Sequence, residues 1–348
     1  MGRFRRAGDP RLPAPRTLLI VAGLLVSAVF AYLAVRNAEL DETIEALRAT
    51  SVPLLVPALG LLTLAFLIRA VRWWSLFATS ARPPLTPLVG AQFVGYLANA
   101  ILPVRAGDAA AIVSLNRRAK TPLAEGTATM FVARAEDVLS LVFLLFVLLP
   151  WYPSVSWIRG AAAIGLVLLL GLAFVVALVL VFRDGAIRLL VRPLGWLPFV
   201  SDAALERAPA HFIRGLAGLL SPRVALVSFA WTTLSWVVLG VGFWLVMEAC
   251  QLSLSPFAGL LVVIGIGLAM ILPSSPAALG VFEGATVVVL SAYGVSDSEA
   301  LSYAFVLHAL NILPLFVFAA ALLTVRRLRR SSPGSAPLAP SLTPSREH

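Results

Sequence analysis

Charged residues are scarce in this sequence. Only 13% of its 348 residues are Asp, Glu, Lys or Arg, whereas 60% are hydrophobic. Ordinary soluble domains contain about 25% charged residues, so this composition excludes a water-soluble fold. Several windows are long enough for an α-helix to cross a bilayer, which takes about 20 apolar residues. The sequence therefore predicts an all-α polytopic membrane protein.

Thiols and metal ligands are scarce as well. The single cysteine, Cys250, has no second cysteine with which to form an internal disulfide, and the three histidines are scattered along the chain. The sequence also lacks the DDxxD, G-x-S-x-G, HExxH and Walker A motifs. We therefore expect no metal, no cofactor and no enzymatic activity.

Long apolar segments are abundant. Two shorter, interrupted segments, near 88–118 and 257–293, lie among segments long enough for full spans. The first full span follows the basic RFRR, as a signal peptide would, but its apolar core is longer than the about 7–15 residues of a signal peptide, so we interpret it as an uncleaved anchor. The six predicted full spans are 17–35, 52–70, 126–149, 160–182, 224–247 and 299–325.

Positive charge is concentrated on one side of the predicted topology. If the N-terminus is cytoplasmic and both interrupted segments return to the side they came from, 23 of the 27 Lys and Arg residues are cytoplasmic. This asymmetry follows the positive-inside rule. The net charge of +10 therefore reflects topology, requires no nucleic acid, and is compatible with contacts to anionic lipid headgroups. We expect a multi-pass protein of the cell inner (plasma) membrane with both termini in the cytoplasm.

Three segments lie outside the predicted spans. We expect 1–16 to form a basic cytoplasmic N-terminus, and the Ser/Pro-rich 327–348 to form a disordered cytoplasmic tail. The mixture of Arg with Leu, Ile and Phe in 183–223 indicates amphipathic pieces on the inner leaflet, although a simple linker explains it equally well. The transmembrane domain is predicted to cover 17–326.

Each interrupted segment turns at proline. The first reads ILPVRAGD (101–108) and the second ILPSSPAALGVFE (271–283). Proline removes a backbone donor and breaks the helix, and in hydrocarbon the freed groups must be satisfied by protein or trapped water. Glycine permits a close turn. The residues that we expect to break the helices are Pro103, Gly107, Pro273, Pro276 and Gly280.

Both breaks are followed by a carboxylate, Asp108 in the first and Glu283 in the second. A chain that enters the membrane partway, turns and leaves again forms a polar pit in which such a carboxylate is hydrated. Ordinary helical hairpins with interfacial turns are the alternative. We favour re-entrant or broken-helix hairpins because each apolar arm is short for a span.

The two halves of the sequence, about 52–149 and 224–325, align weakly in the order span, interrupted segment, span. The ILP tripeptides of the two breaks coincide. Beyond a four-residue insertion, an offset of 174 pairs polar residues with polar residues: Arg134 with His308, and Asp137 with Asn311.

Charge indicates how the two copies are related. The turn and exit of the first copy are basic, whereas 224–325 contains no Lys or Arg. The second turn is therefore expected to face outside, which makes the repeats inverted. Inverted repeats of broken helices are typical of transport proteins, in which the site lies where the breaks meet.

Polar and ionisable groups inside a membrane are costly and usually mark a substrate pathway. The candidate substrate-binding residues are Asn99, Arg105, Asp108, Arg134, Asp137 and Glu283. Secondary candidates are Glu136, His308 and Asn311.

The spacing of Arg134 and Asp137 places both on one helical face, where they can pair or share a ligand. A purely structural tie between helices is the alternative, and we favour a functional role. For His308 and Asn311 we favour a satisfied structural polar pair. Arg69 and Arg72 are expected to snorkel to the interface as anchors, a role that involves no substrate.

Four ordered motifs resemble the flippase-like family named for the transmembrane region of lysylphosphatidylglycerol synthases: RWWSLF (72–77), GYLANAILPVRAGDAAAIVSL (95–115), ARAEDVLSL (133–141) and ILPSSPAALGVFEGA (271–285). The resemblance covers about 17–325. It implies a membrane domain that moves aminoacylated or otherwise decorated lipids between leaflets, or that serves glycolipid or polyprenyl-linked sugar pathways. The soluble aminoacyl-transferase domain of the bifunctional members is expected to be absent.

The sequence departs from the family's motifs at four positions. Asp108 stands where the family often has Glu, and Ala111 stands in place of Arg. Ala133 replaces a leading Glu, and Ala277 replaces Gly. The other motif residues match, namely Arg134, Asp137, Pro276, Gly280 and Glu283.

These observations lead to a principal hypothesis and two alternatives. In the first, a lipid translocator without a nucleotide site, Arg105 and Arg134 meet the phosphate of a phospholipid or lipid-linked substrate, while Asp108, Asp137 and Glu283 meet cationic or hydroxyl groups. The second is a non-transporting partner of an enzyme of lipid or glycolipid synthesis. The third and weakest is an intramembrane transferase.

Overall fold

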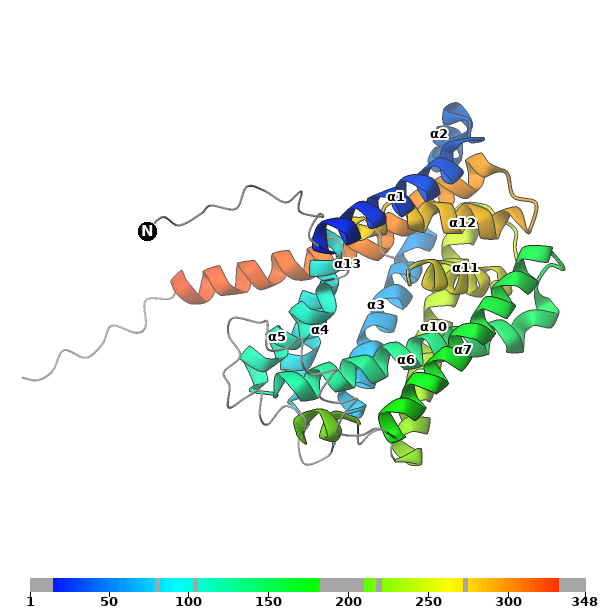
Figure 1. Cartoon of the computed structure of the whole chain (residues 1–348). Coiled ribbons are helices and arrows are strands. Elements are labelled where there is room, and N and C mark those ends of the chain that lie inside the picture. The colour runs from blue at the N-terminus through cyan, green and yellow to red at the C-terminus, as the bar shows by residue number, and fades with distance from the viewer. Residues whose placement is uncertain are drawn as a thin grey trace, which may run out of the picture.

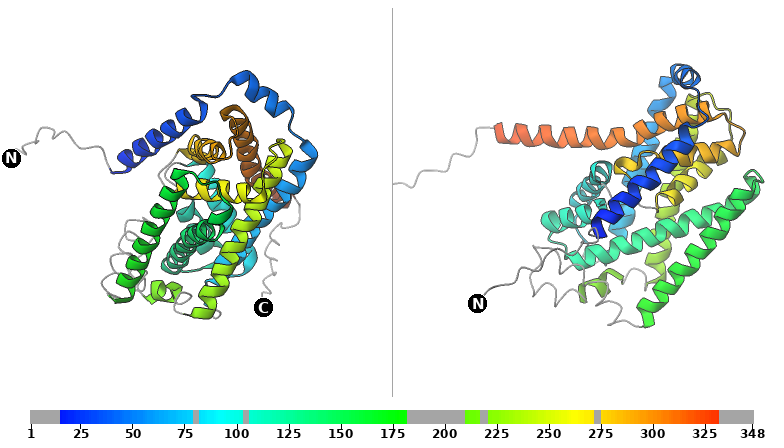
Figure 2. Two further views of the ribbon diagram at one scale, coloured as in Figure 1. Left: turned by 90° about the vertical axis from the view of Figure 1, so that its right-hand side faces the viewer. Right: turned by 45° about the horizontal axis from the view of Figure 1, so that its top comes forward.

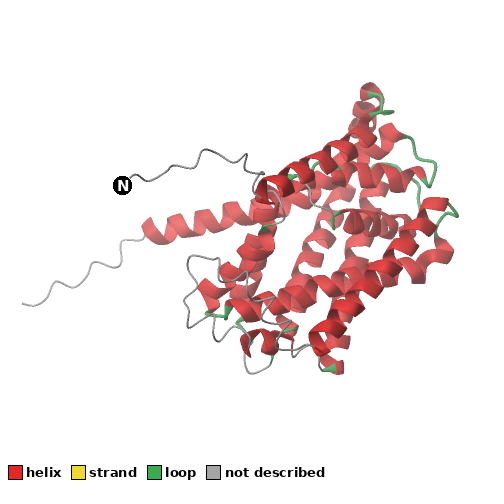
Figure 3. Ribbon diagram, in the orientation of Figure 1, coloured by secondary structure: helices red, strands yellow, loops and turns green. Residues whose placement is uncertain are grey.

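The computed structural model describes six stretches of the chain, which are helices joined by short connections and contain no strand (Figures 1 and 3). Pro103, Arg105 and Pro273 lie outside the described residues, as do most of the predicted connection 183–223 and most of the two predicted terminal segments. The described stretches are 15–78, 82–102, 106–181, 210–216, 221–271 and 275–331.

Every predicted full span contains a helix. Among the described residues, three helices are long and apolar enough to cross a membrane: α3, α10 and the first part of α13, Asp297–Ala320. Helix α13 continues to residue 331, five residues into the segment predicted as the tail. The bounds are α1 (Pro15–Val35), α3 (Val52–Ser75), α6 (Leu123–Leu148), α7 (Ser156–Val181), α10 (Pro222–Ala249) and α13 (Asp297–Ser331).

The two interrupted segments are broken as predicted. The first hairpin consists of α4 (Leu85–Ile101) and α5 (Gly107–Ala119). The second consists of α11 (Pro256–Ala269), the 3-10 turn η4 (Pro276–Ala278) and α12 (Val281–Ser291). The longest of these helices has 17 residues, which is fewer than the about 20 that a full span requires.

Two short elements were not predicted. Helix α2 (Leu40–Arg48) lies in the acidic segment between α1 and α3 and packs against α13. The 3-10 turn η2 (Leu149–Trp151) ends α6. Both contain residues that the hydropathy pattern assigned to a connection or to the end of a span.

Helices α3 and α10 pack side by side and run in opposite directions (Figures 1 and 2). The backbone N–H of Ser51, just before α3, donates to the carbonyl oxygen of Ala249 at the end of α10, at 2.7 Å. The first hairpin follows the end of α3 and the second follows the end of α10, so the two hairpins begin at opposite ends of this pair.

The second hairpin reaches the first. Its 3-10 turn η4 contacts α4, and α13 also packs against α4, where Phe318 stacks on Phe93 with ring centroids 4.1 Å apart. Helix α1 lies over the second hairpin and fixes its turn, because the N–H of Ser275 donates to Oγ of Ser27 at 2.8 Å. The two chain breaks are therefore brought to the same region of the molecule.

Small residues let the arms of the first hairpin approach closely. At Gly107, the first residue of α5, there is no room for a Cβ. A Cβ there would collide with the carbonyl oxygen of Gly95 and with the side chain of Asn99. The backbone N–H of Gly107 donates to Oδ1 of Asn99 at 2.7 Å. Gly107 therefore permits contact between α4 and α5, and its dihedral angles are not the left-handed ones of a glycine turn.

Apolar side chains fill two clusters and also cover the outside. One buried cluster centres on α10, α11 and α12, and the other lies where α3, α4 and α6 meet. Large apolar side chains remain exposed on outer helices, for example Leu25 on α1 and Phe174 on α7. Such a surface is stable in lipid, which supports an integral membrane protein.

Candidate functional site

An arginine buried at the end of α3 organises the polar centre of the first half. Nη1 of Arg72 donates to the carbonyl oxygen of Ala133 at 2.7 Å and to Oδ1 of Asp137 at 3.0 Å. The Arg72 side chain is only 4% exposed. The expectation that Arg72 snorkels to the interface is wrong, because an acceptor-rich stretch of α6 holds its guanidinium inside the protein.

Arg134 bridges two elements. Its Nε and Nη2 donate to the two carboxylate oxygens of Asp108, on α5, at 2.8 and 2.5 Å. Its Nη1 donates to Oδ2 of Asp137 at 2.9 Å, so the pair predicted from the three-residue spacing is present. Asp137 thus accepts from two arginines, one buried and one whose side chain is 45% exposed.

A small cavity lies beside these groups. It has about 10 Å³ of room for the centre of a water molecule, enough for about one water. Arg134, Asp108 and the aromatic Tyr96 are among the residues that line it. The full lining is Arg72, Trp73, Gln92, Gly95, Tyr96, Asp108, Ala111, Met130 and Arg134.

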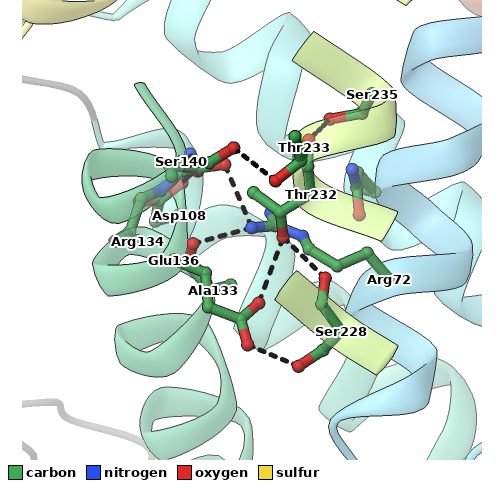
Figure 4. A network of polar contacts seen from close by, with 12 residues as sticks. Arg72, Asp108, Ala133, Arg134, Glu136, Ser140, Ser228, Thr232, Thr233 and Ser235 are labelled. Atoms are coloured by element: carbon green, nitrogen blue, oxygen red, sulfur yellow. Dashed lines mark hydrogen bonds and ion pairs between the residues drawn. The ribbon is translucent and has the colours of Figure 1, made fainter. Parts of the chain in front are cut away.

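Glu136 points away from this cavity toward α10. Oγ of Ser228 hydrogen-bonds to its Oε1, and Oγ1 of Thr232 donates to its Oε2 at 3.1 Å (Figure 4). Four residues further along α6, Ser140 donates to Oγ1 of Thr233 at 2.9 Å. This face of α6 holds the helix against α10, so the geometry gives Glu136 a structural tie.

A second arginine of α3, Arg69, is half-buried. The guanidinium carbon of Arg69 sits 4.1 Å from the centroid of the Trp236 ring on α10, a cation–π contact. Its Nε and Nη2 are buried and, within the described residues, make no hydrogen bond. Arg69 was expected to snorkel. Its position instead places a further cation close to the Arg72–Asp137 pair.

The second hairpin has its own carboxylate and base. Oε1 of Glu283 lies 2.5 Å from Nδ1 of His308, and both residues are buried. Oε2 of Glu283 accepts from the backbone N–H of Gly280 at 2.7 Å, which caps the start of α12. Nε2 of His308 lies 3.0 Å from the carbonyl oxygen of Ala277. Sequence reasoning kept Glu283 and His308 in separate clusters, and the fold joins them.

The backbone around this pair is unusual. Gly280 has φ +84°, as the predicted glycine turn requires, and Ala277 and Ala278 have φ values of 55° and 58°. Pro276 opens the turn η4 in which both alanines lie. Positive φ is unfavourable for alanine, so the surrounding contacts hold this turn in place.

Two remaining candidates use their polar groups locally. Oδ1 of Asn99 accepts from Gly107, as described above. Nδ2 of Asn311 donates to the carbonyl oxygen of Leu307, one turn back in α13, at 3.1 Å. His308 bonds to the second hairpin, so the expected polar pairing of His308 with Asn311 does not form.

The carboxylate–base pairs occupy matching positions in the two halves. Asp108 follows the first break and bonds to Arg134, while Glu283 follows the second break and bonds to His308. Arg134 and His308 are the residues that the 174-residue offset superimposes. Each pair joins the second arm of a hairpin to the helix that follows it.

The family model described as the lysylphosphatidylglycerol synthase TM region matches residues 20–319. The chain belongs to this family. A search of the curated proteins gives no match. The expected resemblance is thereby confirmed, and it covers both hairpins and the helices that carry the two carboxylate–base pairs.

Within the TM-region fold, the residues missed by sequence reasoning are Arg69 and Arg72. A cation near the end of an apolar span usually snorkels, so their positions on α3 misled the interpretation. The residue that could have indicated a buried arginine partner was Asp137. A carboxylate in the middle of α6 needs more positive charge than the half-exposed Arg134 alone supplies.

Proposed function

We propose that this protein binds the headgroup of a membrane phospholipid or lipid-linked substrate where its two hairpins meet, and moves that headgroup between leaflets. The observation that carries the proposal is Arg134, a half-exposed guanidinium beside a cavity and held between Asp108 and Asp137. Arginine recognises phosphate bidentately with the same two-donor geometry that it uses for Asp108.

Binding of a phosphate would change the structure around Arg134. Its Nε and Nη2 already bond to Asp108, so a phosphate that takes these donors releases Asp108. Asp108 belongs to α5 and Arg134 to α6. Exchange of carboxylate for phosphate therefore loosens the first hairpin from α6, while Asp137 keeps its bond to the buried Arg72.

The arrangement of the two halves supports movement across the membrane. The antiparallel α3 and α10, the hairpins that start at opposite ends, and the matching carboxylate–base pairs are the features of an inverted repeat of about 52–149 and 224–325. In such repeats, loosening one half or the other opens a shared site alternately to the two sides.

We propose a plasma-membrane location with both termini in the cytoplasm, on the strength of the arginine asymmetry. Cysteines introduced at Ser296 and Ser332 test it with an impermeant thiol reagent on whole cells. Labelling only at Ser296 is expected, and labelling only at Ser332, or at both, overturns the orientation. Cys250 is replaced first, although burial raises the pKa of its thiol to about 11 and makes it slow to react.

We further propose that the chain is not itself an enzyme and has no nucleic-acid partner, since a translocator needs neither catalytic groups nor base contacts. Among the described residues, no three His, Cys, Asp or Glu side chains are grouped so as to hold a metal ion. A non-transporting partner of a lipid- or glycolipid-synthesising enzyme is the competing reading. A protein that binds the headgroup but does not move lipid between leaflets would favour this alternative.

The decisive experiment uses purified protein in liposomes. Fluorescent phosphatidylglycerol and phosphatidylethanolamine, labelled on an acyl chain, are placed in both leaflets, and dithionite quenches the outer one. Wild type is expected to let the inner pool reach the outside faster than in protein-free liposomes. Arg134→Gln should remove this movement. Arg36→Gln, which changes an exposed arginine outside the predicted spans, is the matched control and should retain it.

Two results would overturn the proposal. Wild type that moves neither probe faster than protein-free liposomes favours the non-transporting partner. Equal movement by wild type and a folded Arg134→Gln protein shows that lipid moves without the Arg134 site. Elution as a single symmetrical peak in size-exclusion chromatography establishes that each variant is folded before it is compared.

A further inference from the structure

The hydrogen-bond partners of His308 fix where its protons can be. A carbonyl oxygen only accepts hydrogen bonds, so Nε2 of His308, 3.0 Å from the carbonyl oxygen of Ala277, carries a hydrogen and donates it. Nδ1 is then the only ring nitrogen whose protonation varies. It faces Oε1 of Glu283 at 2.5 Å.

One more proton belongs between Nδ1 and Oε1. Without it, a nitrogen lone pair would face a carboxylate oxygen at hydrogen-bond distance, which is repulsive. With it, the pair is either a carboxylic acid donating to neutral imidazole or an imidazolium donating to carboxylate. In both forms Glu283 and His308 together are neutral, and the structure therefore holds a proton that this pair can gain or lose as a unit.

The corresponding pair of the first half has no such freedom. Arg134 occupies the position equivalent to His308, and arginine stays protonated in proteins. Histidine is the side chain whose charge changes near neutral pH. The two halves therefore present a fixed positive charge at one break and a titratable base at the other.

Few other titratable groups belong to the helices that carry the pair. Glu283 is the only one on α12, and α11 has none. On α13, Tyr303 lies nearest in sequence and donates its hydroxyl to the carbonyl oxygen of Phe243 at 3.1 Å. Asp297 and Glu299 lie at the start of α13, two or more turns before His308, and the arginines of α13 lie near its end, at positions 326, 327, 329 and 330.

The other helices packed against α12 and α13 also carry tyrosines and charged residues. Tyr96 of α4 hydrogen-bonds to Gln92 and lines the Arg134 cavity, and tyrosine ionises only near about pH 10. On α3 the charges are those of the first-half site. The rest are Arg16 and Tyr32 on α1, the acidic residues and Arg48 on α2, and Arg223 and Glu248 near the two ends of α10.

We propose that Glu283 and His308 form a proton-binding site that couples headgroup movement to a proton gradient. The coupling rests on the proposed lipid movement, whereas the proton site rests on the geometry alone. The pair releases its shared H⁺ to water, which leaves a Glu283 carboxylate that keeps its bond from Gly280 and a neutral His308 with no hydrogen on Nδ1, and the pair takes up H⁺ again in the reverse step. Because Glu283 is on the second hairpin and His308 on α13, release requires these elements to separate.

The contact surface of the pair explains why release needs separation. The His308 ring stacks on Phe282 with centroids 4.4 Å apart, and both members of the pair are buried. Water therefore reaches the shared proton only when the second hairpin moves. Movement of the hairpin and exchange of the proton are the same event, which is the requirement for coupling.

The first test observes the proton directly and needs no lipid movement. The chain has only three histidines, so protein labelled with ¹⁵N-histidine in lipid nanodiscs gives few imidazole signals, and His308→Gln identifies the signal of His308. The Nδ1 signal is expected to change as the pH is raised, because the pair then loses its shared proton, and Glu283→Gln should alter the pH dependence of this signal. An Nδ1 signal that does not respond to pH, or a response that is the same in Glu283→Gln, overturns the proton site.

The second test observes coupling in the liposomes described above. One pH unit corresponds to about 1.36 kcal/mol, so exchange of one proton per lipid shifts the final leaflet ratio of the probe about tenfold per pH unit. Wild type is expected to show a shift toward this limit, and Glu299→Gln, which removes a carboxyl from the start of the same helix, should show it too. His308→Arg, which copies the fixed charge of the first half, should give a ratio independent of the gradient.

The outcomes separate the two proposals. Lipid movement with a leaflet ratio that ignores the gradient overturns coupling and leaves the proposed function intact. A titrating His308 in a protein that moves no lipid overturns the proposed function, and the coupling with it, and leaves the proton site intact. A gradient-dependent ratio that persists in a folded His308→Arg protein assigns the coupling to other groups and overturns the proposal.

Discussion

Asp137 is the residue whose loss should damage the fold most, because it is shared by two arginines with different surroundings. Asp137→Ala leaves Arg72, whose side chain is 4% exposed, with only the carbonyl oxygen of Ala133 as acceptor among its described contacts. Removing one partner of a buried ion pair costs about 3–5 kcal/mol, since the other charge stays buried without compensation. We expect Asp137→Ala to fold poorly.

Arg134→Ala should behave differently. It removes a side chain that is 45% exposed, and Asp137 keeps its bond to Arg72 at 3.0 Å. Exposed ion pairs contribute about 1 kcal/mol or less. We therefore expect Arg134→Ala to remain abundant and folded while losing lipid movement. Although Arg134 and Asp137 bond to each other, the Asp137 variant should lose stability and the Arg134 variant should lose only activity.

The assay is thermal unfolding of purified protein in one detergent, followed by tryptophan fluorescence, together with the yield of the symmetrical size-exclusion peak. The double variant Arg72→Leu, Asp137→Leu completes a cycle. Replacing both members of a buried pair by apolar residues is often neutral, so the double variant should recover much of the stability that either single variant loses. Arg36→Gln is the unperturbed reference.

The result that refutes this reasoning is a reversed or equal order. If Arg134→Ala lowers the unfolding temperature as much as Asp137→Ala, the Arg72–Asp137 pair does not carry the stability assigned to it. Additive effects of Arg72→Leu and Asp137→Leu would likewise show that the two side chains act independently.

Two further predictions concern the backbone of the hairpins. Gly107→Ala should lower stability by about 1–3 kcal/mol in the same unfolding assay, because the added methyl group would collide with Gly95 and Asn99. The control Gly60→Ala, which has open space around its Cβ, should be neutral or stabilising. Equal effects at both glycines would contradict the close packing of α4 and α5. The left-handed backbone conformation of Ala277 costs roughly 1–2 kcal/mol, which Ala277→Gly would relieve. The greater entropy of the unfolded glycine chain offsets about 0.4–1 kcal/mol of this gain, so a small rise in unfolding temperature is expected. A clear fall would show that the turn is not strained.

The sequence by itself determined the membrane class, the long helices and the two segments in which a helix is broken. Apolar length and proline act locally, so the two interrupted segments could be found without knowing what surrounds them. The Arg134–Asp137 pair belongs with these successes, since a spacing of three residues on one helix fixes their proximity.

The tertiary structure alone decided which groups from different elements meet. Spacing says nothing about contacts between helices. Arg72 was therefore assigned to the interface although α6 buries it, and His308 was paired with Asn311 although its partner is Glu283. Packing of α3 against α6, and of the second hairpin against α13, sets these contacts. A side chain on an isolated helix has its neighbours on that helix; its partner across the fold exists only once the helices are assembled.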